Sequence, residues 1–427
     1  MRRHYWLLLF PLGVFAFVAP VVSYFNAIFT TDTRWVVAAA LALVMVGTGR
    51  AFSLLRQDVG LALAAYVSWC VLTYSWSEVP ELTLLKSGAL ALVGMGLFAG
   101  GQYWVVRLGW ERALSYLLPI LALALFAGAF GQAAIEQSSD GLTLYEGLTN
   151  NPNMLGSLMN MAVPFLLWQS YRSRGRRRQL ILWLGLLGVV LGVLLLSVSR
   201  SSIVAALITC GVFLAVVGIR RNGLLSALAA ALLCGSVMAV PDVYETLEQR
   251  YVRKVPEGSE LAVLNSRQEL WEESYEQAIK GGIVGGGYGV TIGDMDFAGG
   301  LTSVGYGREK GNSQLAMMEE TGIVGLGLYL MFLVVLFYRA TLPMRRSVDP
   351  DMKVMGAILL GALLGQTVQS LFEAWWVAPG SPESAYFWAM SGVATGLSVE
   401  IRQRVTSFMH RLPERFWQDR GAGHGDG

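Results

Sequence analysis

The sequence has little charge for its length. Only 15% of its 427 residues are Asp, Glu, Lys or Arg, which is too few to cover the surface of a soluble chain of this size. Apolar residues make up 54% of the chain and gather in runs of about 17–25 residues, the length that crosses ~30 Å of hydrocarbon as a helix. This pattern excludes a soluble domain and predicts an all-α polytopic membrane protein.

Cysteine and histidine are also scarce, with three of each. The cysteines (Cys70, Cys210 and Cys234) all lie inside apolar runs, where a disulfide framework or a metal site is not expected. On the predicted outer face, His, Cys and Asp form no cluster with the spacing of metal ligands. We therefore predict chemistry that needs neither a metal nor a cofactor, and we expect no nucleic-acid partner.

Twelve apolar runs have the length of membrane-spanning helices. They lie at residues 5–22, 35–49, 59–75, 84–103, 113–131, 153–170, 180–197, 201–218, 223–241, 313–337, 354–372 and 384–400. We expect residues 1–400 to form one transmembrane bundle of about twelve helices. The tail at 401–427 resembles a basic amphipathic helix with a disordered end, and we expect its helical part to bind membrane lipids.

Lysine and arginine are unevenly distributed among the connections between these runs. With the N-terminus in the cytoplasm, 22 of them fall in the cytoplasmic connections and tails, and the short outer connections hold only Arg34 and Arg200. Because cytoplasmic loops are enriched in these residues, we predict that both termini are cytoplasmic. The protein is then expected in a bacterial inner membrane, with one large, partly helical periplasmic loop at 242–312 between spans 9 and 10.

That loop has an internal pattern. Residues 243–254 predict a short helix, and Ser266 to Glu269 match a capping box that would open a second helix ending near Lys280. This places Arg267 in the first turn of the second helix. Three residues are predicted to share one face of that helix: Trp271, Tyr275 and Ala278.

Seven glycines follow between Gly281 and Gly293, too many for a regular helix at reasonable cost. The run has neither a Walker lysine nor a G-x-G-x-x-G pattern before a helix, so it does not predict a nucleotide site. It is either a mobile loop over a site or a plain linker.

Polar residues within the apolar runs are costly in hydrocarbon and therefore mark either function or contacts between helices. Four of them are candidates for a polar substrate path: Asn153, Asn160, Asn312 and Gln366. Another stripe consists of Gln366, Gln369, Ser370 and Glu373. For the amides and hydroxyls, hydrogen bonds that only hold the bundle together are the alternative. For the adjacent carboxylates Glu319 and Glu320, just inside the outer boundary, a catalytic role is favoured.

Arg200 lies in a short polar break between two apolar runs and cannot move far from the membrane edge. Its permanent charge needs an anionic partner, with contact to lipid phosphate as the alternative. Arg267, Arg308 and Lys310 also lie on the predicted outer face. Because guanidinium groups bind phosphate oxygens in pairs, these four cations are candidates to bind a lipid-linked diphosphate.

The order of several short segments resembles that in the O-antigen ligase/polymerase superfamily of membrane glycosyltransferases. They are Ser75–Pro80, Asn150–Asn153, Ser199–Ser202, Arg267–Trp271 with the glycine run after it, and Gly311–Leu315 leading to Glu320–Gly325. Together they span nearly the whole chain, and the resemblance rests on their order and topology.

The resemblance implies an enzyme that takes glycan from an undecaprenyl-diphosphate-linked donor at the periplasmic face. Ligases of this superfamily transfer it to the lipid A core, and Wzy-type polymerases transfer it to another lipid-linked glycan. The family's arginines that contact the diphosphate would correspond to Arg200 and Arg267.

One position departs from the family pattern. Many ligases have a His-Asn pair where this chain has Gly311-Asn312, and its histidines (His4, His410 and His424) are all predicted to be cytoplasmic. This favours a polymerase of exopolysaccharide or O-antigen type over a ligase. Any general base would then be a carboxylate, with Glu309, Glu319 and Glu320 as candidates. A multispan small-solute transporter remains the alternative from another class, because polar stripes also line transport paths.

Overall fold

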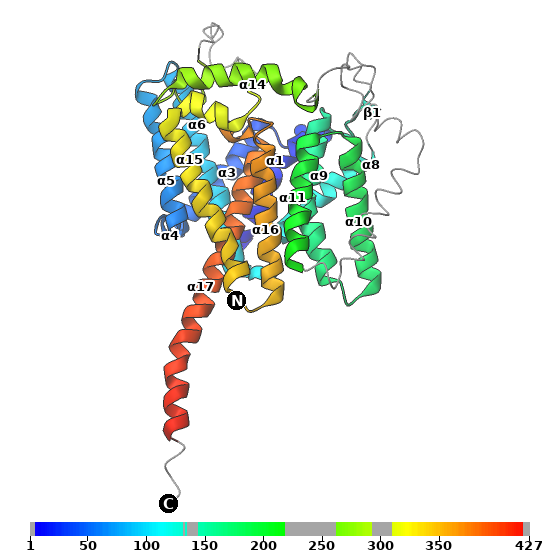
Figure 1. Ribbon diagram of the computed structural model, residues 1–427, viewed down its shortest axis with the longest axis vertical. Helices are drawn as coiled ribbons and strands as arrows, with labels where there is room; N and C mark the ends of the chain where they lie inside the picture. The colour runs from blue at the N-terminus through cyan, green and yellow to red at the C-terminus, as the bar shows by residue number, and fades with distance from the viewer. Residues whose placement is uncertain (1–4, 131–132, 135–143, 218–261, 293–309, 422–427) are drawn as a thin grey trace, which may run out of the picture.

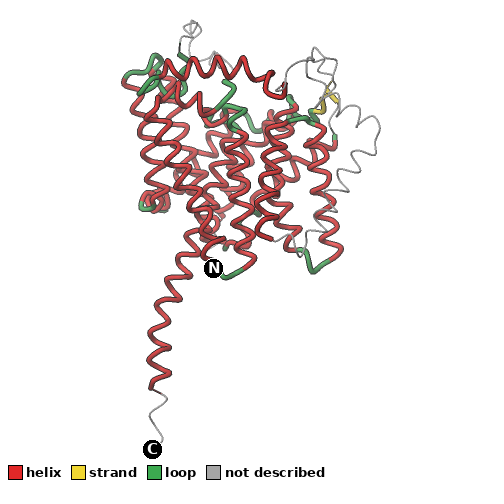
Figure 2. Tube along the Cα trace, in the orientation of Figure 1, coloured by secondary structure: helices red, strands yellow, loops and turns green. Residues whose placement is uncertain are grey.

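The computed structural model shows an upright bundle of helices with one helix, α14, lying across one end (Figures 1 and 2). It describes residues 5–130, 133–134, 144–217, 262–292 and 310–421. Nearly all of this part of the chain is helical, apart from a short antiparallel pair of strands, β1 Ala133–Ala134 and β2 Leu144–Tyr145. The predicted helical class is therefore confirmed.

The α-helices, in chain order, are α1 Leu9–Val18, α2 Ser23–Asn26, α3 Thr31–Gly47, α4 Arg50–Leu55, α5 Asp58–Leu72, α6 Pro80–Val93, α7 Ala99–Leu108, α8 Leu118–Ala129, α9 Pro152–Arg172, α10 Arg177–Leu196, α11 Arg200–Val217, α14 Ala262–Gly281, α15 Ser313–Arg346, α16 Pro350–Gln369 and α17 Pro382–Gly421. Short 3-10 turns are η1 Tyr5–Leu8, η2 Ala19–Val21, η3 Thr73–Ser75, η5 Trp110–Arg112, η6 Ser115–Leu117 and η8 Trp375–Val377. A π-helical turn, η4 Gly94–Phe98, joins α6 to α7.

Three of the long helices begin at a side-chain cap. The side chains of Asn151, Asn312 and Asp349 accept hydrogen bonds from backbone N–H groups in the first turns of α9, α15 and α16. In α9 and α16 the next residue is proline, which fits the first helical position because it has no N–H to satisfy. The sequence therefore sets where these helices start.

Within the described residues, seven helical segments are long and apolar enough to cross a membrane. They are Asp58–Ser75, Pro80–Leu108, Trp110–Ala129, Arg177–Leu196, Arg200–Val217, Ser313–Arg346 and Pro350–Gln369. This identifies a multi-pass membrane protein. The predicted span at 223–241 and the predicted helix at 243–254 lie outside the described residues.

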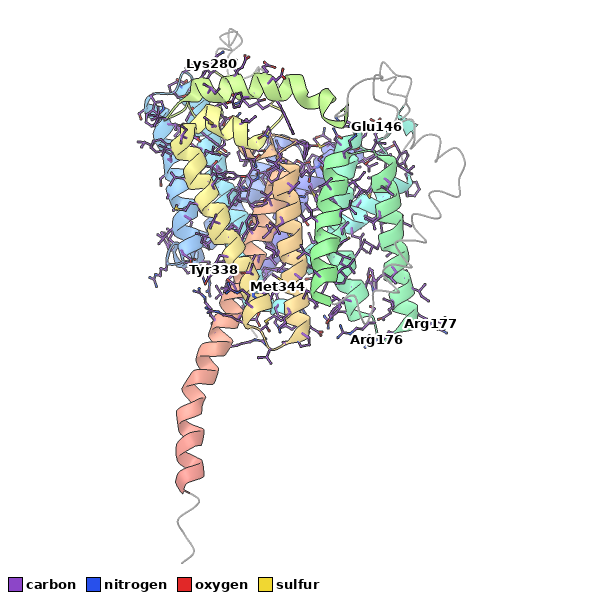
Figure 3. All side chains as sticks on the ribbon, viewed as in Figure 1. Glu146, Arg176, Arg177, Lys280, Tyr338 and Met344 are labelled. Atoms are coloured by element: carbon purple, nitrogen blue, oxygen red, sulfur yellow. The ribbon has the colours of Figure 1, made fainter. Side chains whose placement is uncertain are left out.

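One end of the bundle carries a cluster of arginines. Figure 3 places Lys280 and Glu146 at the end that carries α14, called here the α14 end. Arg176, Arg177, Tyr338 and Met344 lie at the opposite end. The connection at 172–178, which holds five arginines, is thus separated from α14 by the length of the bundle.

Two long helices differ from simple spans. Helix α15 is broken at Gly322, whose φ of 69° and ψ of −174° are not helical, so a short segment at the α14 end meets a longer one at an angle. Helix α17 continues without interruption across residue 400 and extends beyond the bundle at the opposite end (Figure 1). The helical tail is thus an extension of the last helix of the bundle.

Candidate functional site at the α14 end

The segment around Arg200 is held by close packing against α9. Ser199 and Ser202 are buried, and the Ser199 hydroxyl donates to that of Ser202 at 2.9 Å. A Cβ on Gly156 of α9 would overlap Ser199, so only glycine permits this approach. Val198 has a φ of 54°, a conformation that is strained for a β-branched residue. The backbone that leads into Arg200 is therefore fixed in an unusual shape.

A chain of hydrogen bonds connects this segment to α9 and α16. The Gln369 amide donates to the hydroxyls of Ser157 at 2.8 Å and Ser202 at 3.1 Å. The Ser201 hydroxyl donates to a carboxylate oxygen of Glu373 at 3.2 Å. Arg200, the first residue of α11, therefore lies beside a buried polar network and next to the connection that follows α16.

Helix α14 also contacts the connection between α16 and α17. The indole N–H of Trp271 donates to the Gly311 carbonyl at 3.3 Å, and its ring lies 5.6 Å from that of Phe372. Arg267 is one turn before Trp271 in α14. Because Phe372 and Glu373 are neighbours, the helices that carry Arg200 and Arg267 both contact one short connection between α16 and α17.

Two details of α14 differ from the sequence prediction. The helix begins at Ala262, so Ser266 does not cap it and Arg267 lies in the second turn. The capping-box pattern was misleading because Ala262–Asn265 also form helix. On the buried face, Ser274 takes the place predicted for Tyr275: Ser274 is 2% exposed and Tyr275 is 59% exposed. Both sets fit the helical period, so periodicity alone did not decide between Ser274 and Tyr275.

The glycine run is a packed strap, called here the glycine strap and defined as residues 281–292. Its Gly286 and Gly287 N–H groups donate to the carbonyls of Glu319 and Glu320 at 3.1 and 2.9 Å. It also accepts the Trp76 indole N–H and the Glu78 backbone N–H at its Gly285 and Gly286 carbonyls, at 3.1 and 3.3 Å. The strap is thus neither helix nor plain linker, because it joins the α5–α6 connection to α15.

Glu319 and Glu320 lie beneath the strap, at most 1% exposed. The Lys310 ammonium lies 2.7 Å from a Glu320 oxygen and 3.4 Å from a Glu319 oxygen, and its side chain is 6% exposed. Backbone N–H groups of Gly289 and Ile292 donate to Glu320 and Glu319 at 2.6 and 3.1 Å. Lys310, a predicted phosphate ligand, is thus directed toward carboxylates, and these carboxylates already bind a cation and strap amides.

The four residues of the predicted polar path have different surroundings. Asn312 caps α15 through hydrogen bonds of 2.8 and 3.0 Å from Gln314 and Leu315 N–H groups. Asn160 is 5% exposed, and Asn153 is partly buried in the first turn of α9. Gln366 is 1% exposed, and within the described residues neither atom of its amide has a hydrogen-bond partner. Of the four, Gln366 is the one whose buried amide atoms lack hydrogen bonds from the described residues, which is costly.

The structure also adds two residues to the candidate site. Glu373, the last member of the Gln366 stripe, accepts a hydrogen bond from the hydroxyl of Ser201, although no specific role was predicted for it. Lys86 of α6 donates to the Gly289 carbonyl of the strap at 3.0 Å. The feature of the sequence that could have identified Glu373 is its place at the end of a polar stripe.

Two predicted site residues, Arg308 and Glu309, lie outside the described residues.

These features define a class: a polytopic helical membrane protein with a built polar site at one end of its bundle. Residues 184–330 match the model of the O-antigen ligase family, about a third of the chain that includes Arg200, Arg267, Lys310, Glu319 and Glu320. The resemblance to the O-antigen ligase/polymerase superfamily is therefore confirmed.

A search of curated proteins found no match. One solved structure, described as "Structural coordination of polymerization and crosslinking by a peptidoglycan synthase complex", is similar over 81% of this chain and 97% of that one. Its sequence identity is 19% and its TM-score is 0.42, so this likeness supports no inference.

The contact between Gly156 and Ser199 gives a direct test of the Arg200 segment. We expect Gly156→Ala to lower turnover by about tenfold or more, because the new methyl group must displace the residues leading into Arg200. The control is Gly185→Ala in α10, where an added Cβ meets nothing within 4 Å. Glycan transfer by both variants at equal protein level is the measurement, and equal activity would contradict a fixed geometry at Arg200.

Proposed function

We propose that this protein is a metal-independent glycosyltransferase that polymerises glycan from an undecaprenyl-diphosphate-linked donor, as a Wzy-type exopolysaccharide or O-antigen polymerase. The observation that carries the proposal is the convergence of two helices on one connection. Ser201, next to Arg200, contacts Glu373, and Trp271, one turn from Arg267, contacts Phe372. Two guanidinium groups carried by these helices would suit the two phosphates of one diphosphate.

The proposed reaction is a displacement at the anomeric carbon of the donor sugar. An acceptor hydroxyl oxygen forms a bond to that carbon while the bond from the carbon to the phosphate oxygen breaks. The electron pair of the broken bond goes to the departing diphosphate, whose growing negative charge Arg200 and Arg267 stabilise. The proton of the acceptor hydroxyl passes to a carboxylate or to water.

The arrangement of the carboxylates bears on the choice of base. Glu319 and Glu320 are buried, bound to Lys310 and to strap amides, and so suit holding the strap in place. Glu373 is partly exposed and contacts the serine that follows Arg200. We therefore propose Glu373 as the carboxylate best placed beside the acceptor, ahead of the three glutamates favoured by the sequence.

The membrane placement is part of the same proposal. We propose about twelve spans with both termini in the cytoplasm of a bacterial inner membrane, so that the α14 end is periplasmic. The arginine-rich connection at 172–178 lies at the end opposite α14, as this orientation requires (Figure 3).

Reporter fusions test this orientation. A cytoplasmic reporter placed after Arg178 or Arg346 is expected to be active, and a periplasmic reporter is expected to be active near Gly258. A cytoplasmic reporter that is active at Gly258 would reverse the placement of the site.

The glycan phenotype of a deletion strain separates the candidate functions. A polymerase predicts loss of long-chain polymer and accumulation of single lipid-linked repeat units, restored by the wild-type gene. A ligase predicts that polymer is still made and remains on the lipid carrier instead of the lipid A core. The Gly311-Asn312 pair favours the first result, because it lacks the histidine found there in many ligases. Unchanged lipid-linked intermediates and unchanged polymer would contradict both.

A further inference from the structure

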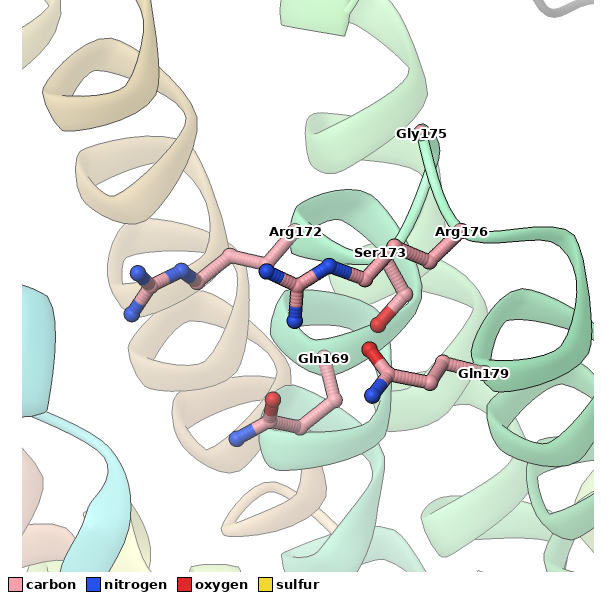
Figure 4. Close-up of a pocket in the computed structure, with 6 residues that line it drawn as sticks. All are labelled: Gln169, Arg172, Ser173, Gly175, Arg176 and Gln179. Carbon is pink, nitrogen blue, oxygen red and sulfur yellow. The ribbon is translucent and has the colours of Figure 1, made fainter.

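A polar pocket lies at the end of the bundle opposite α14, in the turn between α9 and α10 (Figure 4). Its volume is about 390 Å³. The residues that line it are Gln169, Arg172, Ser173, Gly175, Arg176 and Gln179. It shares no residue with the site at the α14 end, and every lining side chain can donate a hydrogen bond except that of the glycine.

The charge around this pocket is strongly positive. Residues 172–178 contain five arginines. Two carboxylates face them, Glu111 at 3.6 Å from Arg172 and Asp351 at 3.2 Å from Arg174, which leaves a net charge of three. Both ion pairs are well exposed and therefore weak. Helix α10 adds the free N–H groups of its first turn, which has no capping side chain and no acidic residue.

A serine hydroxyl also lies in this field. Ser173 is 5% exposed, and it lines the pocket together with the arginines. In Figure 4 this hydroxyl lies beside the side chains of Arg176 and Gln179, and Arg172 extends in the same direction as Arg176. An anion with several acceptor oxygens, such as a phosphate, would satisfy these donors together and offset the repulsion between the guanidinium groups.

The surface next to the pocket identifies the source of that phosphate. Two apolar residues of the first turns of α10, Ile181 and Leu182, are 60% and 56% exposed. Val189 and Leu196 continue the exposed apolar surface along the helix at 54% and 44%. Only Val190 and Leu194 of α10 are buried. A charged pocket at the end of a spanning helix, continued by exposed apolar side chains, matches one phospholipid molecule in shape and chemistry.

We propose that this pocket binds the phosphate of an anionic phospholipid whose acyl chains lie along α10. Arg172, Arg176, Ser173 and Gln179 donate to the phosphate oxygens. This lipid site is separate from the proposed transfer reaction, so its failure would leave the proposed function untouched.

The test measures lipid retained by the full-length protein in detergent, by native mass spectrometry after incubation with phosphatidylglycerol. We expect Arg172→Gln/Arg176→Gln to reduce the fraction carrying phosphatidylglycerol by about tenfold or more, since two charge-assisted hydrogen-bonding groups are removed. The matched control is Arg177→Gln/Arg178→Gln, which removes the same charge from neighbouring residues that do not line the pocket. A second variant, Ser173→Ala, keeps the charge and should weaken retention severalfold.

Three results would overturn the proposal. Equal loss of lipid in both double variants would mean diffuse attraction to a basic surface. Unchanged retention in the pocket variant, with both proteins monodisperse, would mean that no lipid is held there. Displacement of phosphatidylglycerol by millimolar inorganic phosphate would mean that the pocket binds free anions and that the apolar surface of α10 plays no part.

Discussion

Replacing either arginine with alanine, in Arg200→Ala or Arg267→Ala, is expected to lower polymer formation at least about a hundredfold while the protein still inserts and accumulates. In the proposed reaction, charge on the departing diphosphate grows as the glycosyl bond breaks, and interactions that strengthen in the transition state affect the chemical step most. Arg→Lys at either position should restore activity only in part, because an ammonium keeps the charge and loses the paired hydrogen bonds of the guanidinium.

The measurement is polymer made from a lipid-linked donor by equal amounts of each purified variant. Arg177→Ala is the control, because Arg177 lies at the opposite end of the bundle (Figure 3) and should not affect turnover. If Arg200→Ala and Arg267→Ala both retain wild-type activity, the diphosphate-binding role is wrong and a small-solute transporter becomes the leading alternative.

The second large effect is expected at Lys310. Lys310→Met leaves two buried carboxylates without their cation and should destabilise the protein by about 3–5 kcal/mol. Loss of monodisperse protein on heating in detergent is the measurement. Lys280→Met is the matched control, since Lys280 is exposed at the end of α14. Adding Glu320→Gln to Lys310→Met removes one unpaired charge and should recover part of the lost stability.

The same variants separate a structural role from a catalytic one. If Glu319 and Glu320 only hold the glycine strap in place, Glu319→Gln and Glu320→Gln should lower the stability of the protein. The protein that stays folded should then retain most of its turnover. If either glutamate is the base, turnover should fall sharply at unchanged donor binding. If Lys310→Met keeps the wild-type fold and an unchanged melting temperature, the buried ion pairs of Lys310 with Glu319 and Glu320 do not stabilise the protein as expected.

The sequence predicted the helical class, because apolar runs of spanning length are a local signal. In the structure, α9 and α16 begin at Asn151-Pro152 and Asp349-Pro350, which supply a cap and a proline at the first helical position. The same local reasoning failed at Ser266. A capping pattern shows only that a helix can start at that point, and the four residues before it also form helix.

The site itself was only partly predictable. Arg200 and the glutamate pair became candidates because charge near hydrocarbon is costly and therefore conspicuous, and Arg267 became one because it lies on the predicted outer face. The partners of those charges come from distant segments: Lys310 meets Glu320 across a helix cap, and Glu373 meets Ser201 from another helix. Periodicity along one helix shows which residues share its face, and it contains no information about which face of another helix lies opposite.

The glycine strap has a consequence for the order in which the chain assembles in the membrane. Its contacts join Thr73 and Trp76 to Tyr288 and Gly285, more than 200 positions later, and to Glu320 of α15. The α5–α6 connection therefore stays without these partners until the ribosome has completed α14 and the first turns of α15. The early spans can enter the membrane one after another, whereas this end of the bundle closes only when the last third of the protein arrives. Insertion of the early spans and closure of the α14 end are thus separate steps of assembly.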